Sequence, residues 1–269
     1  MTAAVGRRTA AAPRILATAL AAATLVVAGC TATTEPTPTG TGDALAGSIT
    51  VFAAASLTTT FEQLADAFEA EHPGTEITFS FAGSSDLVAQ LIEGAPGDVL
   101  ASANEATMDQ LVAADLADGA PTVFATNSLE IAVPPGNPAG VTDFASLADP
   151  ELQLVVCADA VPCGAATAAI EAATGVTLAP VSEENAVTDV LGKVASGEAD
   201  AGLVYGTDVL AAAGAVDGIA FPESAEAVNR YPIVRVVGSG NAALADAFIA
   251  FVLGAKGVAA LESAGFGGP

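Results

Sequence analysis

The sequence predicts an α/β fold in which helices flank parallel sheets, and three observations support this. Short apolar runs with strand character alternate with segments whose apolar residues recur at helical spacing. Such alternation favours a parallel sheet with right-handed crossovers. The chain has 269 residues, 52% of them hydrophobic, which is enough for one or two packed domains.

Three strand–helix units open the folded part of the chain. The first helix has Phe61, Leu64, Ala65 and Phe68 at i, i+3, i+4 and i+7, which predicts one buried face. Asn104 is the expected N-cap of the third helix. The expected strands and helices are, in order, 48–54 and 58–70, 76–81 and 85–93, and 98–102 and 105–114.

A second α/β series begins near residue 127 and extends to the end of the chain. Val187, Val190, Leu191 and Val194 again form one helical stripe. The expected strands are 129–133, 152–157, 201–205 and 231–237, and the expected helices are 164–173, 186–196 and 242–253.

The first 30 residues read as a secretory signal. Three arginines precede an apolar run at 15–28, which is shorter than the ~20 residues of a membrane-spanning helix. The end of this segment resembles the lipobox of bacterial lipoproteins, so we expect Cys30 to carry a lipid; an ordinary cleaved signal with an accidental cysteine is the alternative. Residues 31–47, rich in Thr, Pro, Gly and Ala, predict a flexible tether.

Removal of the signal leaves four cationic residues against 31 acidic ones, a formal charge of about −27. Nucleic-acid binding requires clustered Lys and Arg, so this composition argues against it.

Besides Cys30, the mature chain contains two cysteines, Cys157 and Cys163. Outside the cytoplasm a close pair usually forms a disulfide. Two free thiols or a metal site are the alternatives, although a chain with one histidine offers few other metal ligands.

Two junctions place a serine where a strand meets a helix, Ser56 and Ser84, the latter after the flexible Gly83. In an open parallel sheet, ligands bind beyond the carboxyl ends of the strands, where helix N-termini offer unpaired N–H groups to anions. The alternative is that both serines are only N-caps.

Six segments together resemble the extracytoplasmic molybdate-binding proteins of ABC importers. They occur in the family's order and span nearly all of residues 48–266: "ITVFAAASLTTTFEQLADAFE", "FAGSSDLVAQLIEGAPGDVLASA", "NSLEIAVPP", "VPCGAAT", "GEADAGLVYGTDVL" and "YPIVRV". The resemblance implies a two-lobed type II periplasmic binding protein, each lobe a mainly parallel sheet flanked by helices, with two hinge crossings near 124–129 and 221–231.

The resemblance also implies the residues that bind the oxyanion. In the family, two serine hydroxyls with their N–H groups, two further backbone N–H groups and a tyrosine hydroxyl hold the ligand. Carried over by motif, these are Ser56, Ser84, Cys163, Val187 and Tyr205. Cys163 replaces the usual alanine, and Val187 lies in a segment spelled differently from the family's, so the backbone donor there is Val187 or its neighbour.

The resemblance implies the following organisation. Residues 1–29 are a signal peptide, 30–47 the lipidated cysteine and tether, 48–126 and 231–269 lobe I, and 127–230 lobe II. The protein is expected to be a monomer without a cofactor or enzymatic activity, anchored outside the cytoplasmic membrane. It would pass molybdate or tungstate to an ABC permease and its ATPase.

The ligand set contains no charged side chain, which suits a fully deprotonated oxyanion that only accepts hydrogen bonds. Asp86 is the residue that would change this view if its carboxylate faced the ligand; in the first turn of its helix it is expected to complement the dipole.

Three other functions remain open. The same fold could take sulfate, phosphonate or a chelated metal, with Arg230 and Arg235 as candidate contacts. A hydrolase would use Ser56 or Ser84 as nucleophile, but the only histidine, His72, is expected in a turn far from the strand ends. A purely structural surface lipoprotein would bind no ligand.

Overall fold

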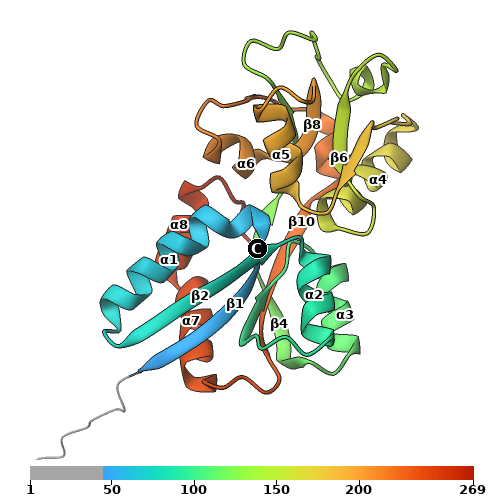
Figure 1. Ribbon diagram of the computed structural model, residues 1–269. Helices are drawn as coiled ribbons and strands as arrows, with labels where there is room; N and C mark the ends of the chain where they lie inside the picture. The colour runs from blue at the N-terminus through green and yellow to red at the C-terminus, as the bar shows by residue number, and fades with distance from the viewer. Residues whose placement is uncertain (1–44) are drawn as a thin grey trace, which may run out of the picture. The chain divides into compact units, whose positions relative to one another are not determined.

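The computed structural model describes residues 45–269, which form two five-stranded sheets with helices packed against them (Figure 1). The predicted signal, Cys30 and the tether up to residue 44 lie outside the described residues. Strand β1 (Gly47–Ala54) begins one residue earlier than expected, because the Gly47 N–H bonds the carbonyl of Gly74 at 2.9 Å. Leu45 already packs against the core, so the tether expected to reach residue 47 ends sooner.

The first sheet has the strand order β2-β1-β3-β10-β4 and is covered by helices on both faces. Helices α1, α7 and α8 cover one face and α2 and α3 the other. The strands besides β1 are β2 (Thr75–Ala82), β3 (Val99–Ala101), β4 (Ala117–Asn127) and β10 (Asn229–Val236). The helices are α1 (Thr58–Glu71), α2 (Ser84–Ile92), α3 (Glu105–Ala113), α7 (Ala242–Leu253) and α8 (Ala255–Ser263).

Alternation along β1 creates these two cores. Val51 packs with Phe61 and Phe248 beneath α1 and α7, whereas its neighbour Phe52 packs with Leu87 of α2 on the opposite face. Successive side chains of a strand point to opposite faces, so one apolar strand fills both layers. The helical stripe predicted on α1 is buried.

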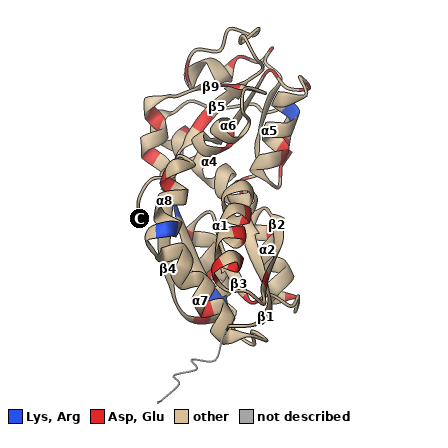
Figure 2. Cartoon of the chain, turned by 90° about the vertical axis from the view of Figure 1, so that its left-hand side faces the viewer, with Lys and Arg blue, Asp and Glu red and all other residues tan. Residues whose placement is uncertain are grey.

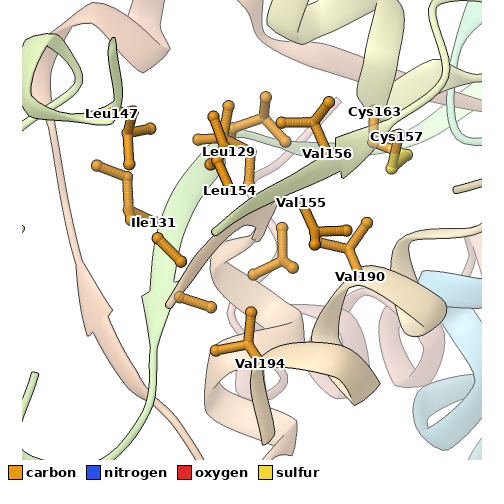
Figure 3. Packing of buried hydrophobic residues seen from close by; sticks show 14 of the residues in the cluster. Leu129, Ile131, Leu147, Leu154, Val155, Val156, Cys157, Cys163, Val190 and Val194 are labelled. Carbon is orange, nitrogen blue, oxygen red and sulfur yellow. A yellow bond between two sulfur atoms is a disulfide. The ribbon is translucent and has the colours of Figure 1, made fainter. Parts of the chain in front are cut away.

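The second sheet has the order β7-β6-β8-β5-β9 and one main apolar cluster. Figure 3 shows Val190 of helix α5 beside Val155, with the Cys157–Cys163 pair nearby; Val194 of the same helix belongs to the same cluster. The strands are β5 (Leu129–Val133), β6 (Leu154–Cys157), β7 (Ser182–Glu184), β8 (Ala201–Tyr205) and β9 (Asp217–Ile219). The helices are α4 (Pro162–Thr174), α5 (Val187–Ala195) and α6 (Gly206–Ala211). We call the first sheet with its helices the first lobe, and the second sheet with its helices the second lobe.

The α/β class with two lobes of mainly parallel strands is confirmed, because in each sheet four strands run in one direction and a single strand, β10 or β5, runs against them. In the first sheet β1 pairs in parallel with β2 and β3, whereas β10 is antiparallel to β3 and β4. In the second sheet β6 is parallel to β7 and β8, whereas β5 is antiparallel to β8 and β9. The chain leaves the first sheet along β4 and returns along β10, so these two strands run in opposite directions.

The two crossings between the sheets lie side by side. Strand β4 ends at Asn127 and β5 begins at Leu129, so a single residue joins the sheets there. Asn127 pairs with Asn229, the first residue of the returning strand β10. The crossings therefore fall within the segments expected from the sequence.

Most predicted elements are present within two residues of their expected ends, and Asn104 caps α3 by accepting the N–H of Thr107. Among the strands and α-helices of the described residues, five were not predicted: β4, β7, β9, α6 and α8. Within residues 45–269, no single helix is long and apolar enough to cross a membrane; α7 and α8 pass that test only as a pair bent by 56°.

Candidate functional site

A small pocket between the two lobes brings together all five residues expected to bind the ligand. Ser56 and Ser84 come from the first lobe, and Cys163, Val187 and Tyr205 from the second. Its other lining residues are mostly small or apolar: Ala54, Ala55, Gly83, Ala103, Val161, Pro162, Asn185 and Ala186.

Helix starts supply the backbone of the pocket. Ser84 and Val187 are the first residues of α2 and α5, and Cys163 is the second residue of α4. N–H groups in the first turn of a helix have no acceptor within the helix and carry the positive end of its dipole. Three helices therefore direct donors at one small space.

Neither serine is a helix N-cap. Gly83 caps α2, and Ser56 lies within the short 3-10 turn Ala55–Leu57, with Leu57 at the N-cap position of α1. The N-cap interpretation of these two residues is therefore wrong. Ser84 is 1% exposed, and its Oγ accepts the N–H of Ala103 at 2.9 Å, which leaves the hydroxyl hydrogen free to donate.

Tyr205 ends β8 with a hydroxyl that has no hydrogen-bond partner among residues 45–269. The side chain is 1% exposed. Burial, with smaller contributions from Tyr231 and Asp208, raises the pKa of Tyr205 well above its usual value, so the hydroxyl remains a donor. A buried polar atom without a partner costs free energy, which a bound acceptor would recover.

Sequence reasoning missed two residues beside Tyr205. Asp208 is 5% exposed, and its Oδ2 accepts the Tyr205 N–H at 3.0 Å. Burial raises the pKa of Asp208 to about 7, partly offset by that hydrogen bond. Tyr231 is fully buried on β10, and its hydroxyl lies 3.0 Å from the Oγ of Ser56.

No lining residue of this pocket carries a formal charge. Figure 2 shows acidic residues spread over both lobes and few cationic ones. Each of the four cationic residues in the described part of the chain pairs with a carboxylate. Arg230 pairs with Glu105 at 3.3 Å and Arg235 with Asp118 at 2.6 Å, so neither serves this pocket, and Asp86 is exposed outside it.

The other candidate chemistries find little support in this geometry. Across residues 45–269, no group of three or more His, Cys, Asp or Glu is placed to hold a metal ion. His72 follows the far end of α1, where its ring lies 4.5 Å from that of Phe68, and it does not line the pocket.

The two lobes touch around the pocket. The Ser85 hydroxyl donates to the Ala160 carbonyl at 2.6 Å, and Asn229 bonds the carbonyls of Ala103 and Pro162. A Cβ on Gly83 would lie 1.9 Å from the Asn185 carbonyl oxygen, so only glycine allows this approach.

The space between these contacts is small. Its volume is about 10 Å³, whereas one water needs ~10–15 Å³, so a four-oxygen anion requires the walls to separate. A wider groove of about 700 Å³ adjoins the pocket at Ser56, and Asp208 lines its wall.

Cys157 and Cys163 are joined by a disulfide, with Cα atoms 5.6 Å apart. The bond closes the loop that carries Ala160 and ends at the start of α4. It therefore ties one wall of the pocket to strand β6.

Comparisons with known proteins agree on one family. The family described as bacterial extracellular solute-binding protein matches residues 49–267. The molybdate-binding protein ModA of Mycobacterium tuberculosis H37Rv is 50% identical over 224 residues, 83% of this chain and 86% of that protein. ModA of Escherichia coli K12 is 33% identical over 237 residues, 84% of this chain and 91% of that protein. The solved periplasmic molybdate-binding protein of Azotobacter vinelandii has the same fold, with a TM-score of 0.72, 24% identity, and coverage of 82% of this chain and 99% of that one.

Proposed function

This chain belongs to the family of bacterial extracellular solute-binding proteins, and we propose that it binds molybdate in the pocket between its lobes for uptake by an ABC transporter. The observation that carries the proposal is the pocket itself: five donor positions from both lobes, no charged side chain, and a buried Tyr205 hydroxyl without a partner among the described residues. The 50% identity with a curated molybdate-binding protein supports the choice of ligand. A family of binding proteins also supports the expectation that the chain is not an enzyme.

The chemistry of the donors matches that of the anion. At neutral pH molybdate is a tetrahedral dianion without hydrogens, so each of its oxygens only accepts. Hydroxyls of Ser56, Ser84 and Tyr205 and backbone N–H groups at both serines, Cys163 and Val187 would supply donors. Hydrogen bonds to a charged partner contribute roughly 1.5–3 kcal/mol each, so several of them hold the anion without a cation.

The same donors define what the site rejects. Phosphate is partly protonated at neutral pH, and its hydrogen would find no acceptor, which costs ~1–3 kcal/mol. Sulfate is also a bare dianion, so only the size of the closed pocket separates it from molybdate. Tungstate is nearly the same size as molybdate and should bind.

Capture requires motion of the lobes. We assign residues 48–126 and 231–269 to lobe I and 127–230 to lobe II, with β4 and β10 as the connections about which they open. The closed form buries the anion and docks on the permease, and its opening there releases the ligand. The protein acts as a monomer, held outside the cytoplasmic membrane by the lipid on Cys30.

Isothermal titration calorimetry of the purified protein with molybdate, tungstate, sulfate and phosphate tests the ligand. Molybdate and tungstate should bind with 1:1 stoichiometry, and phosphate about 5- to 150-fold more weakly. Elemental analysis of the protein after dialysis against trace molybdate and tungstate identifies the bound metal independently. Tighter binding of sulfate or phosphate would assign the pocket to another oxyanion, and absence of heat with all four would refute the proposal.

A further inference from the structure

Tyr231 contacts a residue that lines the pocket but does not line the pocket itself. It is fully buried, it does not line the pocket, and its hydroxyl lies 3.0 Å from the Oγ of Ser56, 175 residues away in sequence. We propose that Tyr231 is a positioning residue that donates its hydroxyl hydrogen to Ser56 and so directs the Ser56 hydroxyl at the oxyanion. This inference rests on the function proposed above.

The tyrosine ring is held firmly enough to fix its hydroxyl. Its ring packs edge-on against those of Phe124, Tyr205 and Phe266, with centroids 6.2, 6.0 and 5.5 Å apart. Tyr231 also lies on β10, two residues after Asn229, which pairs with Asn127 where the chain crosses between the sheets. Ser56 therefore meets a hydroxyl whose position is set by rings from both lobes.

The direction of the Ser56–Tyr231 bond follows from the ligand. Each hydroxyl has one hydrogen, and a bare oxyanion only accepts. If Ser56 gives its hydrogen to the anion, its contact with Tyr231 must have the tyrosine as donor. In the reverse direction Ser56 would turn a lone pair toward an anionic oxygen, which repels it.

Two further features favour this direction. Burial raises the pKa of Tyr231, so the hydroxyl keeps its hydrogen. A hydroxyl that accepts one hydrogen bond is polarised and donates more strongly, so the Tyr231–Ser56–anion chain is stronger than its separate links. Among the bonds described here, Ser84 has the same arrangement, because its Oγ accepts the Ala103 N–H.

A double-mutant cycle measured by calorimetry with molybdate tests the inference. Tyr231→Phe keeps the ring and removes the hydroxyl, so affinity should fall about 3- to 10-fold. In a Ser56→Ala background the same change should alter affinity less than about 2-fold, whereas in Ser84→Ala it should keep its full effect. Tyr205→Phe is the matched control and should weaken binding in both backgrounds.

The possible outcomes separate the two hypotheses. If the wild-type protein binds molybdate but Tyr231→Phe leaves affinity unchanged, the positioning role is overturned and the proposed function stands. An equal loss with and without Ser56 would mean that Tyr231 acts through general packing, which also overturns it; melting temperatures of the ligand-free variants report that packing directly. A wild-type protein that does not bind molybdate would overturn both.

Discussion

Asp208 gives the sharpest test of the electrostatics around the pocket. Its carboxyl group is buried beneath Tyr205, and burial raises its pKa from 3.8 to about 7. The folded state therefore holds its proton to a higher pH than the unfolded state does. Below about pH 4 the carboxyl group is protonated in both states, and the folded state keeps its full stability. As pH rises from about 4 to about 7, the unfolded state ionises first, and this part of the folding stability is lost.

The magnitude follows from the two pKa values. At about 1.36 kcal/mol per pKa unit, the rise from 3.8 to about 7 corresponds to about 4 kcal/mol of destabilisation at alkaline pH. In the Asp208→Asn variant the amide would not ionise, and its oxygen can still accept the Tyr205 N–H. The stability gained by this substitution should therefore grow by about 3 kcal/mol between pH 5 and pH 8.

Urea unfolding of the ligand-free protein at the two pH values measures this difference. Taking the change between pH 5 and pH 8 cancels any packing effect of the amide that does not depend on pH. Asp86→Asn, on an exposed residue of α2, is the matched control. A gain that is equal at both pH values, or larger at pH 5, would show that the buried carboxyl does not control stability in this range.

Three further substitutions test other parts of the site. Tyr205→Phe should lower molybdate affinity about 10- to 150-fold in calorimetry, because it removes a hydrogen bond to a charged ligand. The melting temperature of the ligand-free variant should stay level or rise. Unchanged affinity would exclude the hydroxyl from the site. The double change Cys157→Ser and Cys163→Ser should lower the free energy of unfolding in urea by about 2–3 kcal/mol, with the single-serine variants as comparison. An unchanged free energy of unfolding would mean that the two sulfurs are not bonded in the native protein. Gly83→Ala should weaken molybdate binding strongly, because its Cβ would lie 1.9 Å from a carbonyl oxygen of the other lobe. The control Gly192→Ala, whose Cβ would meet nothing within 4 Å, should bind molybdate normally. Equal affinities of the two variants would show that the lobes do not approach this closely when the ligand is bound.

Strong periodicity explains which elements the sequence could predict. Strands β5 and β8 and helix α7 have the predicted bounds because apolar residues fill each strand or recur at helical spacing along the helix. Strand β4 was missed because Gly119 and Pro121 interrupt it, and it is an edge strand whose pairing with β10 contains irregular register. Helix α6 has six residues and β7 and β9 three each, which is too short for a periodic signal.

The residues of the site also divide into those that the sequence could predict and those that it could not. Four of the five pocket residues lie in segments that match the family's motifs, whereas Val187 begins a helix in a segment that is spelled differently. Tyr231 and Asp208 act through contacts that only the folded chain creates, and no local pattern reveals a partner 175 residues away. The chain contains only two tyrosines, and folding brings them together, with ring centroids 6.0 Å apart.

The strongly acidic composition and the proposed anion-binding pocket are compatible because they act over different distances. Surface charges repel a dianion at long range, but salt screens exposed charges beyond ~8 Å at physiological ionic strength. Hydrogen bonds act at about 3 Å, in a space where no acidic side chain is found among the lining residues. The cations of the described chain are already paired with carboxylates, so the anion gains little from binding elsewhere on the lobes. Selection against a protonated oxyanion then depends on its hydrogen, which would find no acceptor among fixed donors, and charge alone would not distinguish the two.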